Sequence, residues 1–571
     1  MLSVSLIFLY MLLTAYCIGF LTLSGIGWLC AKAGRSERPA AQWRAVKADS
    51  YVMAGLVTVT VYAQLFSLFY KVGAAANFLL LLVCGITAVC FHGELKEALT
   101  EQYRSMTKGT KGFYLVLFLL FAYGTSRGII HYDTGLYHAQ SIRWIEEYGV
   151  VKGLGNLHCR LAYNSSAFSL SALYSFAFLG GQSYHCAAGF FALLLAKVCG
   201  EIAAAWRRKR LVLSDVVRLM GIYYLLMIFD EMVSPASDYF MVLTVFYIVI
   251  RYLDLVELGE NSWMPYGLLA LVCVYTVSIK LSAAFIILLA VKPAVMLIKD
   301  RNGRGILCFC GLGILIIAPY LIRNVLISGW LVYPFTFLDF FAVDWKIPKG
   351  IADYDAREIQ VWGRGIQDVA RYGEPVFSWF GGWFASQGRI DRLFILLGIG
   401  AAPVSAAAWT AAAVRREEKL REEMLAAVTV SFSFLFWLLS APLMRYGCVY
   451  VWLAAPVTFG GLLFWMLEKR AKGRRVETVF WRVLFAAIGL AGCYKAVMFG
   501  MEAVKGYSLQ YMICQKDYEN FETESYEIQG ITFYVPAEGD RTGYDAFPSS
   551  PVKAAAELRG AKLKDGFRYK K

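Results

Sequence analysis

Apolar residues form long blocks along this chain of 571 residues, and short polar breaks separate them. A helix of about 20 mainly apolar residues crosses the hydrocarbon core of a bilayer, and the blocks predict about fourteen such helices. The predicted crossings are approximately 4–30, 51–70, 75–91, 113–129, 184–206, 211–229, 239–256, 264–279, 281–298, 306–323, 391–413, 424–440, 448–467 and 477–499. We therefore expect an all-α polytopic membrane protein.

One apolar stretch, 166–180, is too short to count as a crossing. It is preceded by Tyr163-Asn164-Ser165-Ser166 and followed by Gly180-Gly181-Gln182. We expect a short external or re-entrant helix here, which membranes tolerate when it is packed inside protein. A full crossing at this point would invert the orientation of every later helix.

The composition excludes a soluble globular enzyme and a disordered protein. Hydrophobic residues make up 58% of the chain and charged residues only 17%, whereas soluble domains carry about 25% charged residues. The mean hydropathy is +0.53. Nevertheless 56 Lys and Arg outnumber 42 Asp and Glu, which leaves a net charge of +14.

Most of the basic residues lie in alternate breaks, as the positive-inside rule requires of cytoplasmic loops. The six clusters are Lys32 to Lys47, Lys96 to Lys111, Arg207 to Arg210, Lys299 to Arg304, Arg415 to Arg421 and Lys469 to Arg475. The other breaks are then external, and so are both termini. Because the basic residues are dispersed among loops, a nucleic-acid partner is not expected.

The same alternation divides the chain into three regions. We expect N-terminal transmembrane helices over 1–112, a transmembrane region with external loops 126–183 and 324–390 over 113–499, and a small external tail over 500–571. The tail contains a strand-like piece, 531–535, and several turn signals. Cys159 and Cys514 both fall in external segments, where a disulfide between them could form.

Three acidic residues in the external breaks are candidates for catalysis. Asp133 follows a crossing directly, where a carboxylate could meet both a lipid-borne and a water-borne substrate, although it could equally cap the next helix. Glu231 and Asp238 belong to the second acidic break, and acids so close to a bilayer are costly unless they face water or a cation. A solvated turn, with Asp238 as a helix cap, is the alternative.

Four residues around the first of these acids could bind a divalent metal ion. They are His131, Asp133, His138 and His158, and His and Asp are usual metal ligands. The spacing is not specific, and histidines satisfied by hydrogen bonds at the interface explain it as well. His138 and His158 also remain candidates for substrate binding.

Three external cations depart from the positive-inside pattern. Lys280 lies between two apolar blocks, Arg323 ends a crossing, and Arg445, followed by Tyr446, occupies a tight turn. A phosphate at the outer interface would explain them, because Arg can bind phosphate through two parallel hydrogen bonds. The alternatives are snorkelling to lipid headgroups or pairing with the external acids.

The external segment 324–390 is unusually rich in Trp, Phe and Tyr. Aromatic rings favour the membrane interface, so we expect helices that lie along it. Such helices could cover a groove for a lipid chain or a sugar, or simply anchor the protein.

This combination resembles the GT-C superfamily of integral membrane glycosyltransferases, which take sugars from polyprenyl-phosphate carriers. Several pieces look like a little-characterised bacterial branch of that superfamily, namely YDTGLYHAQSIRWIEEYGVVKGLGNLHCRLAYNSS from Tyr132 to Ser166, RNVLISGWLVYP, GDRTGYDAFPSSP and LRGAKLKDGFR. Three crossings lie before residue 113, where the resemblance begins, and they are a departure from the pattern because such proteins commonly have one crossing before the first large loop.

The resemblance implies roles for individual residues. Asp133 matches the catalytic acid of the first loop, Glu231 and Asp238 match the second acidic loop, and Arg445 matches a contact to the carrier phosphate. The implied reaction is an inverting transfer from a polyprenyl-phosphate-linked sugar to a glycan, lipid or protein acceptor at the external face of a bacterial cytoplasmic membrane. A flippase or transporter for lipid-linked oligosaccharides, a polysaccharide polymerase or ligase, and a non-catalytic scaffold remain alternatives.

Overall fold

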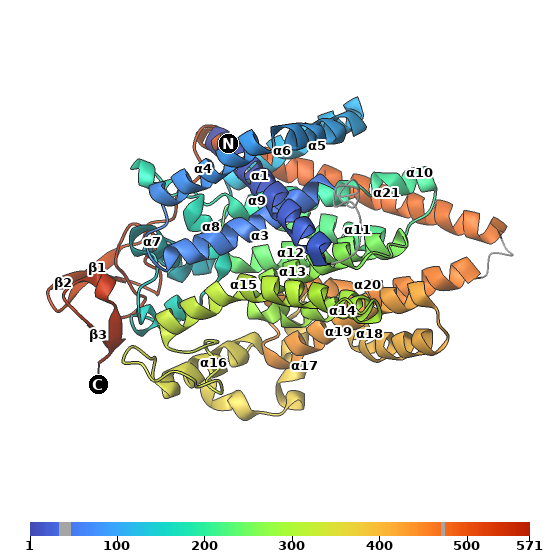
Figure 1. Cartoon of the computed structure of the whole chain (residues 1–571). Helices are drawn as coiled ribbons and strands as arrows, with labels where there is room; N and C mark the ends of the chain where they lie inside the picture. Colours follow the sequence, from blue (N-terminus) through green and yellow to red (C-terminus); the bar gives the residue numbers. More distant parts are fainter. Residues whose placement is uncertain (34–46, 470–473, 571) are drawn as a thin grey trace.

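Long helices account for most of the chain, as the apolar blocks predict (Figure 1). The computed structural model describes residues 1–33, 47–469 and 474–570, so the basic residues predicted to be cytoplasmic over 34–46 and 470–473 lie outside the described residues. The longer helices are α1 (Leu2–Ala33), α3 (Ala48–Ser67), α4 (Ala74–Cys90), α5 (His92–Ser105), α6 (Lys108–Ser126), α7 (Ala139–Tyr148), α8 (Ser166–Leu173), α9 (Ala187–Gly200), α10 (Ala203–Arg208), α11 (Leu213–Met227), α12 (Ser237–Glu257), α13 (Trp263–Ile279), α14 (Val291–Lys299), α15 (Gly303–Ser328), α16 (Lys349–Gly363), α17 (Val376–Ser386), α18 (Arg389–Val414), α19 (Glu418–Ser440), α20 (Met444–Lys469) and α21 (Arg474–Lys505).

Ten helical segments in the described part of the chain are long and apolar enough to cross a membrane. They are Leu2–Cys30, Ala48–Ser67, Ala187–Arg208, Ser237–Glu257, Leu281–Lys299, Gly303–Ser328, Arg389–Val414, Glu418–Ser440, Met444–Lys469 and Val479–Lys505. The pair α4 and α5, bent by 89° at its break, would be an eleventh. The predicted count of about fourteen is therefore not confirmed, because the helices at 75–91, 113–129, 211–229 and 264–279 are bent, short or less apolar.

The stretch 166–180 forms a short helix, as predicted. Helix α8 has eight residues, all of them buried, and a 3-10 turn (Ala177–Leu179) follows it. Because the whole helix is enclosed by protein, its polar groups are kept from lipid although it is too short to cross the bilayer.

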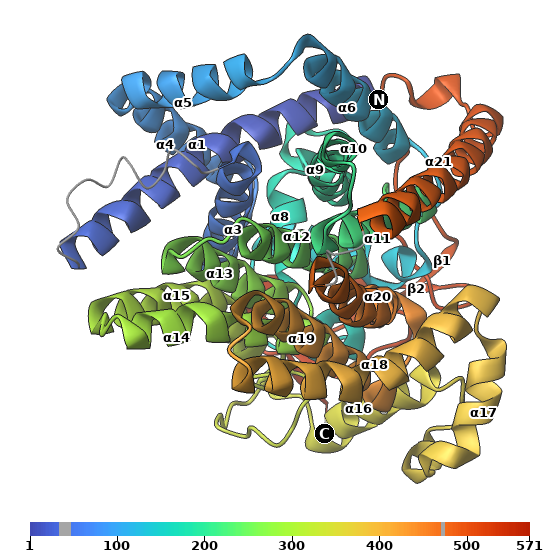
Figure 2. The same ribbon diagram turned by 90° about the vertical axis from the view of Figure 1, so that its right-hand side faces the viewer.

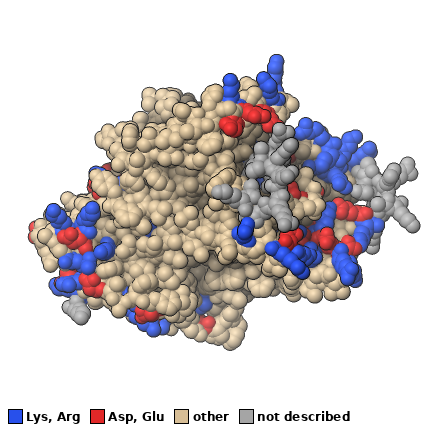
Figure 3. Space-filling view, in the orientation of Figure 1, with Lys and Arg blue, Asp and Glu red and all other residues tan. Residues whose placement is uncertain are grey.

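Charge divides the molecule into two ends and an apolar middle. On the face shown in Figure 3, acidic and basic residues gather at two opposite ends, and a broad area with few charges separates them. The C-terminal residues and α7 lie at one end, and α10 lies at the other (Figure 1). We refer to these as the tail end and the basic end. An apolar belt between two charged ends is what a membrane protein requires.

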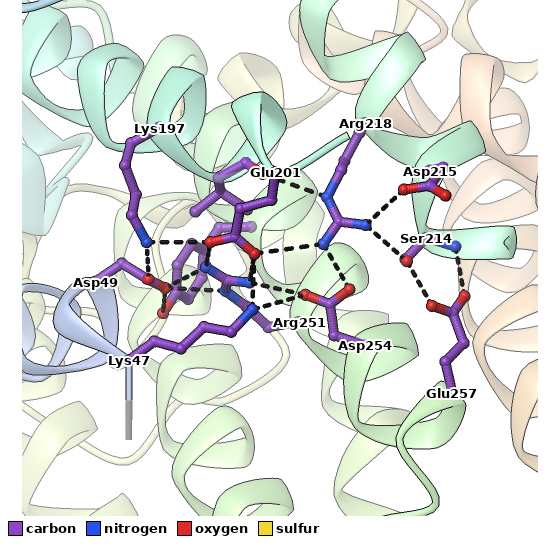
Figure 4. Close-up of polar contacts among 12 residues, drawn as sticks. Lys47, Asp49, Lys197, Glu201, Ser214, Asp215, Arg218, Arg251, Asp254 and Glu257 are labelled. Atoms are coloured by element: carbon purple, nitrogen blue, oxygen red, sulfur yellow. Dashed lines mark hydrogen bonds and ion pairs between the residues drawn. The ribbon is translucent and has the colours of Figure 1, made fainter. Parts of the chain in front are cut away.

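A network of ion pairs, the Asp49 network, joins four helices at the basic end (Figure 4). Its centre is Arg251 of α12, which pairs with Asp49 of α3 at 2.8 Å, Glu201 after α9 at 2.8 Å and Asp254 at 2.7 Å. The other members are Lys47, Lys197, Ser214, Asp215, Arg218 and Glu257. Since these charges are mutually paired and largely buried, we interpret the network as a structural junction.

Removing the central cation of this junction should be strongly destabilising. Arg251→Met would leave the fully buried carboxylate of Asp49 without its main partner, and breaking a buried pair in this way costs about 3–5 kcal/mol. Lys47→Met is the matched control, because Lys47 is 43% exposed and an exposed pair contributes about 0–1 kcal/mol. Thermal unfolding of the two purified variants measures the difference, and equal losses would contradict a buried junction.

Helices α1 and α3 approach each other through two glycines. A Cβ at Gly19 would lie 1.8 Å from the carbonyl oxygen of Tyr51, and one at Gly55 would lie 1.7 Å from that of Ala15. Backbones this close are typical of membrane helix pairs with small residues at the contact.

A larger residue at this contact should separate the two helices. We expect Gly19→Val to lower stability by about 3 kcal/mol or more, because the obstructing atoms are backbone and cannot rotate away. Gly25→Val in the same helix should be nearly neutral, since nothing lies within 4 Å of a Cβ there. Melting temperatures in detergent test this pair, and a similar fall for both variants would refute the packing argument.

The tail contains four short strands, so the protein is not all-α. Strands β1 (Thr523–Ile528) and β2 (Ile531–Pro536) form one antiparallel pair, with Thr523 opposite Pro536, and β3 (Ala556–Leu558) and β4 (Phe567–Tyr569) form another. The strand predicted at 531–535 is confirmed. Phe533 and Phe567 share a core with Trp144 of α7, so the tail packs on the first large loop. Helix α21 ends at Lys505, a few residues beyond the boundary expected near residue 500.

The aromatic segment 324–390 contains α16 and α17, which lie together at one edge of the bundle in both views (Figures 1 and 2). In α17, Trp379 and Trp383 are buried whereas Phe377 is 86% exposed. The indole of Trp383 donates to the carbonyl oxygen of Pro442 at 2.9 Å. The helix is thus attached to the turn before α20. Cys159 and Cys514 are free thiols, so the predicted disulfide is wrong.

Candidate functional site

An ion pair at the tail end joins the two residues that the sequence singled out most clearly. A carboxylate oxygen of Asp133 lies 2.9 Å from Nη2 of Arg445 at the start of α20. The other terminal nitrogen of Arg445, Nη1, lies 2.9 Å from Nε2 of His131, and Nη2 also approaches the Tyr446 hydroxyl at 3.4 Å. The side chain of Arg445 is 33% exposed and that of Asp133 is 16% exposed, so the pair is open to solutes.

A second ion pair adjoins the first through Tyr446. Lys280, between α13 and the 3-10 helix Leu281–Ala290, pairs with Asp238 in the first turn of α12. The ammonium group of Lys280 also lies 3.9 Å from the centre of the Tyr446 ring. Two cations and two acids therefore meet around one tyrosine.

Glu231 joins this group through hydrogen bonding and ring contacts. Its carboxylate accepts a hydrogen bond from the hydroxyl of Tyr239. The ring of Tyr239 contacts His131 edge-on, with centroids 6.3 Å apart. We call the eight connected residues the Asp133 cluster: His131, Asp133, Glu231, Asp238, Tyr239, Lys280, Arg445 and Tyr446.

Irregular backbone borders three charged members of the cluster. A π-helix, Thr134–His138, begins directly after Asp133, and a ten-residue 3-10 helix begins directly after Lys280. Helix α20 is kinked at Gly447, two residues after Arg445, with φ −162° and ψ 21°. Such departures from α-helical geometry are frequent at functional sites.

Neither aspartate caps its helix through a side-chain hydrogen bond, which was the alternative to a functional role. Asp133 precedes the π-helix but makes no capping hydrogen bond, and its carboxylate faces Arg445 instead. Asp238 lies inside the first turn of α12 and pairs with Lys280, while Ala236 occupies the cap position. The expectation that acids at this depth face cations is met by both residues.

His131 faces more hydrogen-bond donors than its neutral ring can accept from. The backbone N–H of Asp133 points at Nδ1, 3.1 Å away, and Arg445 presents an N–H to Nε2. A neutral imidazole has one acceptor nitrogen, so only one of these contacts can be a hydrogen bond. Burial lowers the pKa of His131, although the nearby Asp133 carboxylate opposes the shift. The lowered pKa favours the neutral form of the ring. A neutral ring beside Asp133 can accept a proton.

His138 is buried behind His131 and is closed off from substrate. Its ring centroid lies 6.1 Å from that of His131 and 5.3 Å from that of Phe168, and burial lowers its pKa well below the usual range. His158 lies elsewhere, where its Nδ1 accepts the backbone N–H of Arg160. Within the described ranges, no three His, Cys, Asp or Glu residues are grouped so as to hold a metal ion. The four predicted ligands therefore do not form a metal site here.

Arg323 is also separate from the Asp133 cluster. It is buried within α15, where Nε donates to Asn164 at 3.0 Å and Nη1 donates to Ser67. A side chain enclosed in this way cannot reach a phosphate at the outer interface. Of the three predicted external cations, Lys280 and Arg445 belong to the cluster and Arg323 does not.

The tail contributes contacts beside Asp133 that sequence reasoning did not assign. The backbone N–H groups of Thr542 and Gly543 both donate to the carbonyl oxygen of Gly135 in the π-helix, at 3.0 and 2.9 Å. Asp540 accepts from the hydroxyl of Tyr132, and Arg541 lies 4.6 Å from the centre of the same ring. All of these residues fall in the segments YDTGLYH and GDRTGYD. Both segments are rich in polar and turn residues, and this was the sequence signal that could have indicated a shared site.

The model of a family described as "Domain of unknown function (DUF8201)" matches residues 1–452. The chain belongs to the DUF8201 family. No curated protein and no solved structure matches the chain. In this DUF8201 chain the matched region includes the whole Asp133 cluster and ends before the tail.

A buried carboxylate attaches the tail to α7 in this DUF8201 chain. Glu146 accepts hydrogen bonds from Ser183 at 2.9 Å and from Tyr544 of the tail at 2.5 Å. Burial raises the pKa of Glu146 to about 7, although these hydroxyl donors and that of Ser175 oppose the rise.

This raised pKa should make tail docking pH-dependent. The folded protein keeps the Glu146 proton up to about pH 7, whereas an unfolded glutamate loses it near pH 4.3. Stability should therefore fall by about 2 kcal/mol as pH rises from 5.5 to 8. Glu146→Gln should abolish that fall, and Glu147→Gln, whose side chain is exposed, should retain it. Hydrogen exchange of residues 540–547 at pH 5.5 and 8 measures the effect, and a wild type without pH dependence would contradict it.

Proposed function

We propose that the protein is an integral membrane glycosyltransferase of the GT-C type. It would transfer a sugar from a polyprenyl-phosphate carrier to a glycan, lipid or protein acceptor at the external face of a bacterial cytoplasmic membrane. The observation that carries this proposal is the Asp133 cluster, in which a partly exposed carboxylate lies beside two partly exposed cations. One end of such a site can accept a proton while the other binds a phosphate.

The proposed topology has fourteen crossings, with the tail end outside. On this proposal α4, α6, α11 and α13 also cross, although each is shorter or less apolar than a usual span. In support, α13 ends at Lys280 beside Asp238, so its end reaches the same depth as the start of α12. The backbone N–H groups of Leu2 and Ser3 donate to Met512 and Ile513 in the segment after α21, which supports both termini on one side.

The proposed reaction is an inverting displacement. A hydroxyl oxygen of the acceptor forms a bond to the anomeric carbon, and the bond from that carbon to the carrier phosphate oxygen breaks. Asp133 takes the hydroxyl proton as general base. Arg445 and Lys280 stabilise the negative charge that develops on the departing polyprenyl phosphate.

The ion pairs within the cluster suggest how substrate binding frees Asp133 to act as a base. Without substrate, Arg445 holds Asp133 and Lys280 holds Asp238. A phosphate that binds both cations competes with the two carboxylates, because Arg matches phosphate as well as carboxylate. Substrate binding would thus release Asp133 to accept a proton. The neutral ring of His131 is the second candidate base.

Removal of the proposed base should lower the rate of sugar transfer far more than it weakens binding of the polyprenyl-phosphate donor. We expect Asp133→Asn to lower the transfer rate by about 10²- to 10⁴-fold, the usual contribution of a general base. The measurement is sugar transfer by membranes supplied with defined polyprenyl-phosphate sugars, with product stereochemistry determined at the anomeric carbon. The matched control is Asp339→Asn, an acid in the other large loop whose side chain is 54% exposed.

Two outcomes would contradict the proposal. Wild-type transfer by folded Asp133→Asn would remove Asp133 as base, and a large loss confined to His131→Ala would assign that role to His131. Absence of transfer from every polyprenyl-phosphate sugar, with transport of lipid-linked oligosaccharide instead, would replace the glycosyltransferase with a flippase.

A further inference from the structure

Arg323 is a buried cation without an acidic partner. It is 2% exposed, and no carboxylate among the described residues lies within ion-pair distance of it. Its two hydrogen-bond acceptors, Asn164 and Ser67, are both neutral, and Nη2 donates to no described residue. An isolated charge in such surroundings is unfavourable unless an opposite charge accompanies it.

A small cavity adjoins this guanidinium. It has a volume of about 20 Å³ and lies among α7, α15 and the loop that precedes α8. Its polar lining comes from Ser141, Trp144, Tyr163, Asn164 and Arg323, and the rest is aliphatic, aromatic or glycine. The lining contains no Asp or Glu side chain.

Two further hydrogen-bond donors in this lining have no partner. The indole N–H of Trp144 and the hydroxyl of Ser141 are buried, and neither makes a hydrogen bond within the described part of the chain. Buried donors are normally satisfied, so each orphan requires an explanation. Here two unpaired donors and an uncompensated cation line one cavity. A single negatively charged hydrogen-bond acceptor would satisfy all three.

The size of the cavity restricts the ligand class. A volume of about 20 Å³ holds one particle the size of a water molecule. Among anions, a monatomic halide is the smallest that can accept from all three donors at once. Apolar walls with N–H and O–H donors also disfavour a cation.

We propose that this cavity binds one halide ion, normally chloride. The ion is held by the Arg323 guanidinium, the Trp144 indole N–H and the Ser141 hydroxyl. It links α7, which follows the π-helix of the Asp133 cluster, to α15 of the bundle. The site does not depend on the proposed glycosyltransferase activity and should exist whatever the reaction.

Halide binding to the folded protein should raise its melting temperature. We expect the full-length protein in detergent to melt about 2–6 °C higher in sodium chloride or bromide than in sodium gluconate of equal ionic strength, because a ligand that binds only the folded state stabilises it. Gluconate is too large for the cavity. Ser141→Ala alone should reduce this difference in melting temperature. The double variant with both Ser141→Ala and Trp144→Phe should abolish it.

Trp345→Phe is the matched control. Its indole N–H donates to the carbonyl oxygen of Val325 at 3.0 Å and is not part of the cavity lining. This variant should lose stability equally in all three salts and keep the difference between halide and gluconate. If Trp345→Phe also lost the difference in melting temperature between halide and gluconate, the assignment to this cavity would be overturned.

Crystals of the wild-type protein grown in bromide give an independent test that needs no variant. An anomalous peak between Arg323 and Trp144 would support the site. A cavity that contains only water, or equal melting of the wild type in chloride, bromide and gluconate, would overturn the proposal.

Discussion

A charged side chain next to an apolar belt must meet an opposite charge or water, and the structure depends on this constraint at both of its ends. At the basic end, Arg251 and the carboxylates around it join α3, α9 and α12. At the tail end, Asp133 pairs with Arg445, and Asp238 pairs with Lys280. The two groups differ in access. Asp49 is fully enclosed, whereas Arg445 is one-third exposed, so the Arg445 pair can exchange its partner with a solute and the Asp49 pair cannot.

The exchangeable pairs are held where the helices depart from regular geometry. The π-helix after Asp133 widens the turn that carries it, and the kink at Gly447 alters the direction of α20 next to Arg445. A Cβ at Gly447 would lie 2.5 Å from the ring of Trp437, so only glycine permits this packing.

Much of this arrangement could be predicted from the sequence, because apolar block length and charge alternation report directly on burial. The short helix at 166–180, the strand at 531–535 and the acids and cations of the Asp133 cluster were all visible in this way. The sequence could not show that Asp133 faces Arg445 rather than its own helix N-terminus, since that depends on tertiary packing between distant segments. For the same reason Arg323 looked like an interfacial cation, although α15 buries it against Asn164. The crossing count remains a proposal because α11 and α13, with 15 and 17 residues, are shorter than a usual span.

The tail contacts the π-helix that directly follows Asp133. Thr542 and Gly543 donate to the Gly135 carbonyl of the π-helix, and Asp540 accepts a hydrogen bond from Tyr132 beside it. A Cβ at Gly135 would lie 2.8 Å from the ring of Phe521, so the tail covers this segment without a gap. The segment that carries Asp133 is therefore fixed from one side by the bundle and from the other by the last part of the chain. The cluster itself contains no tail residue, but the tail contacts the π-helix that directly follows Asp133 and so supports the position of that carboxylate.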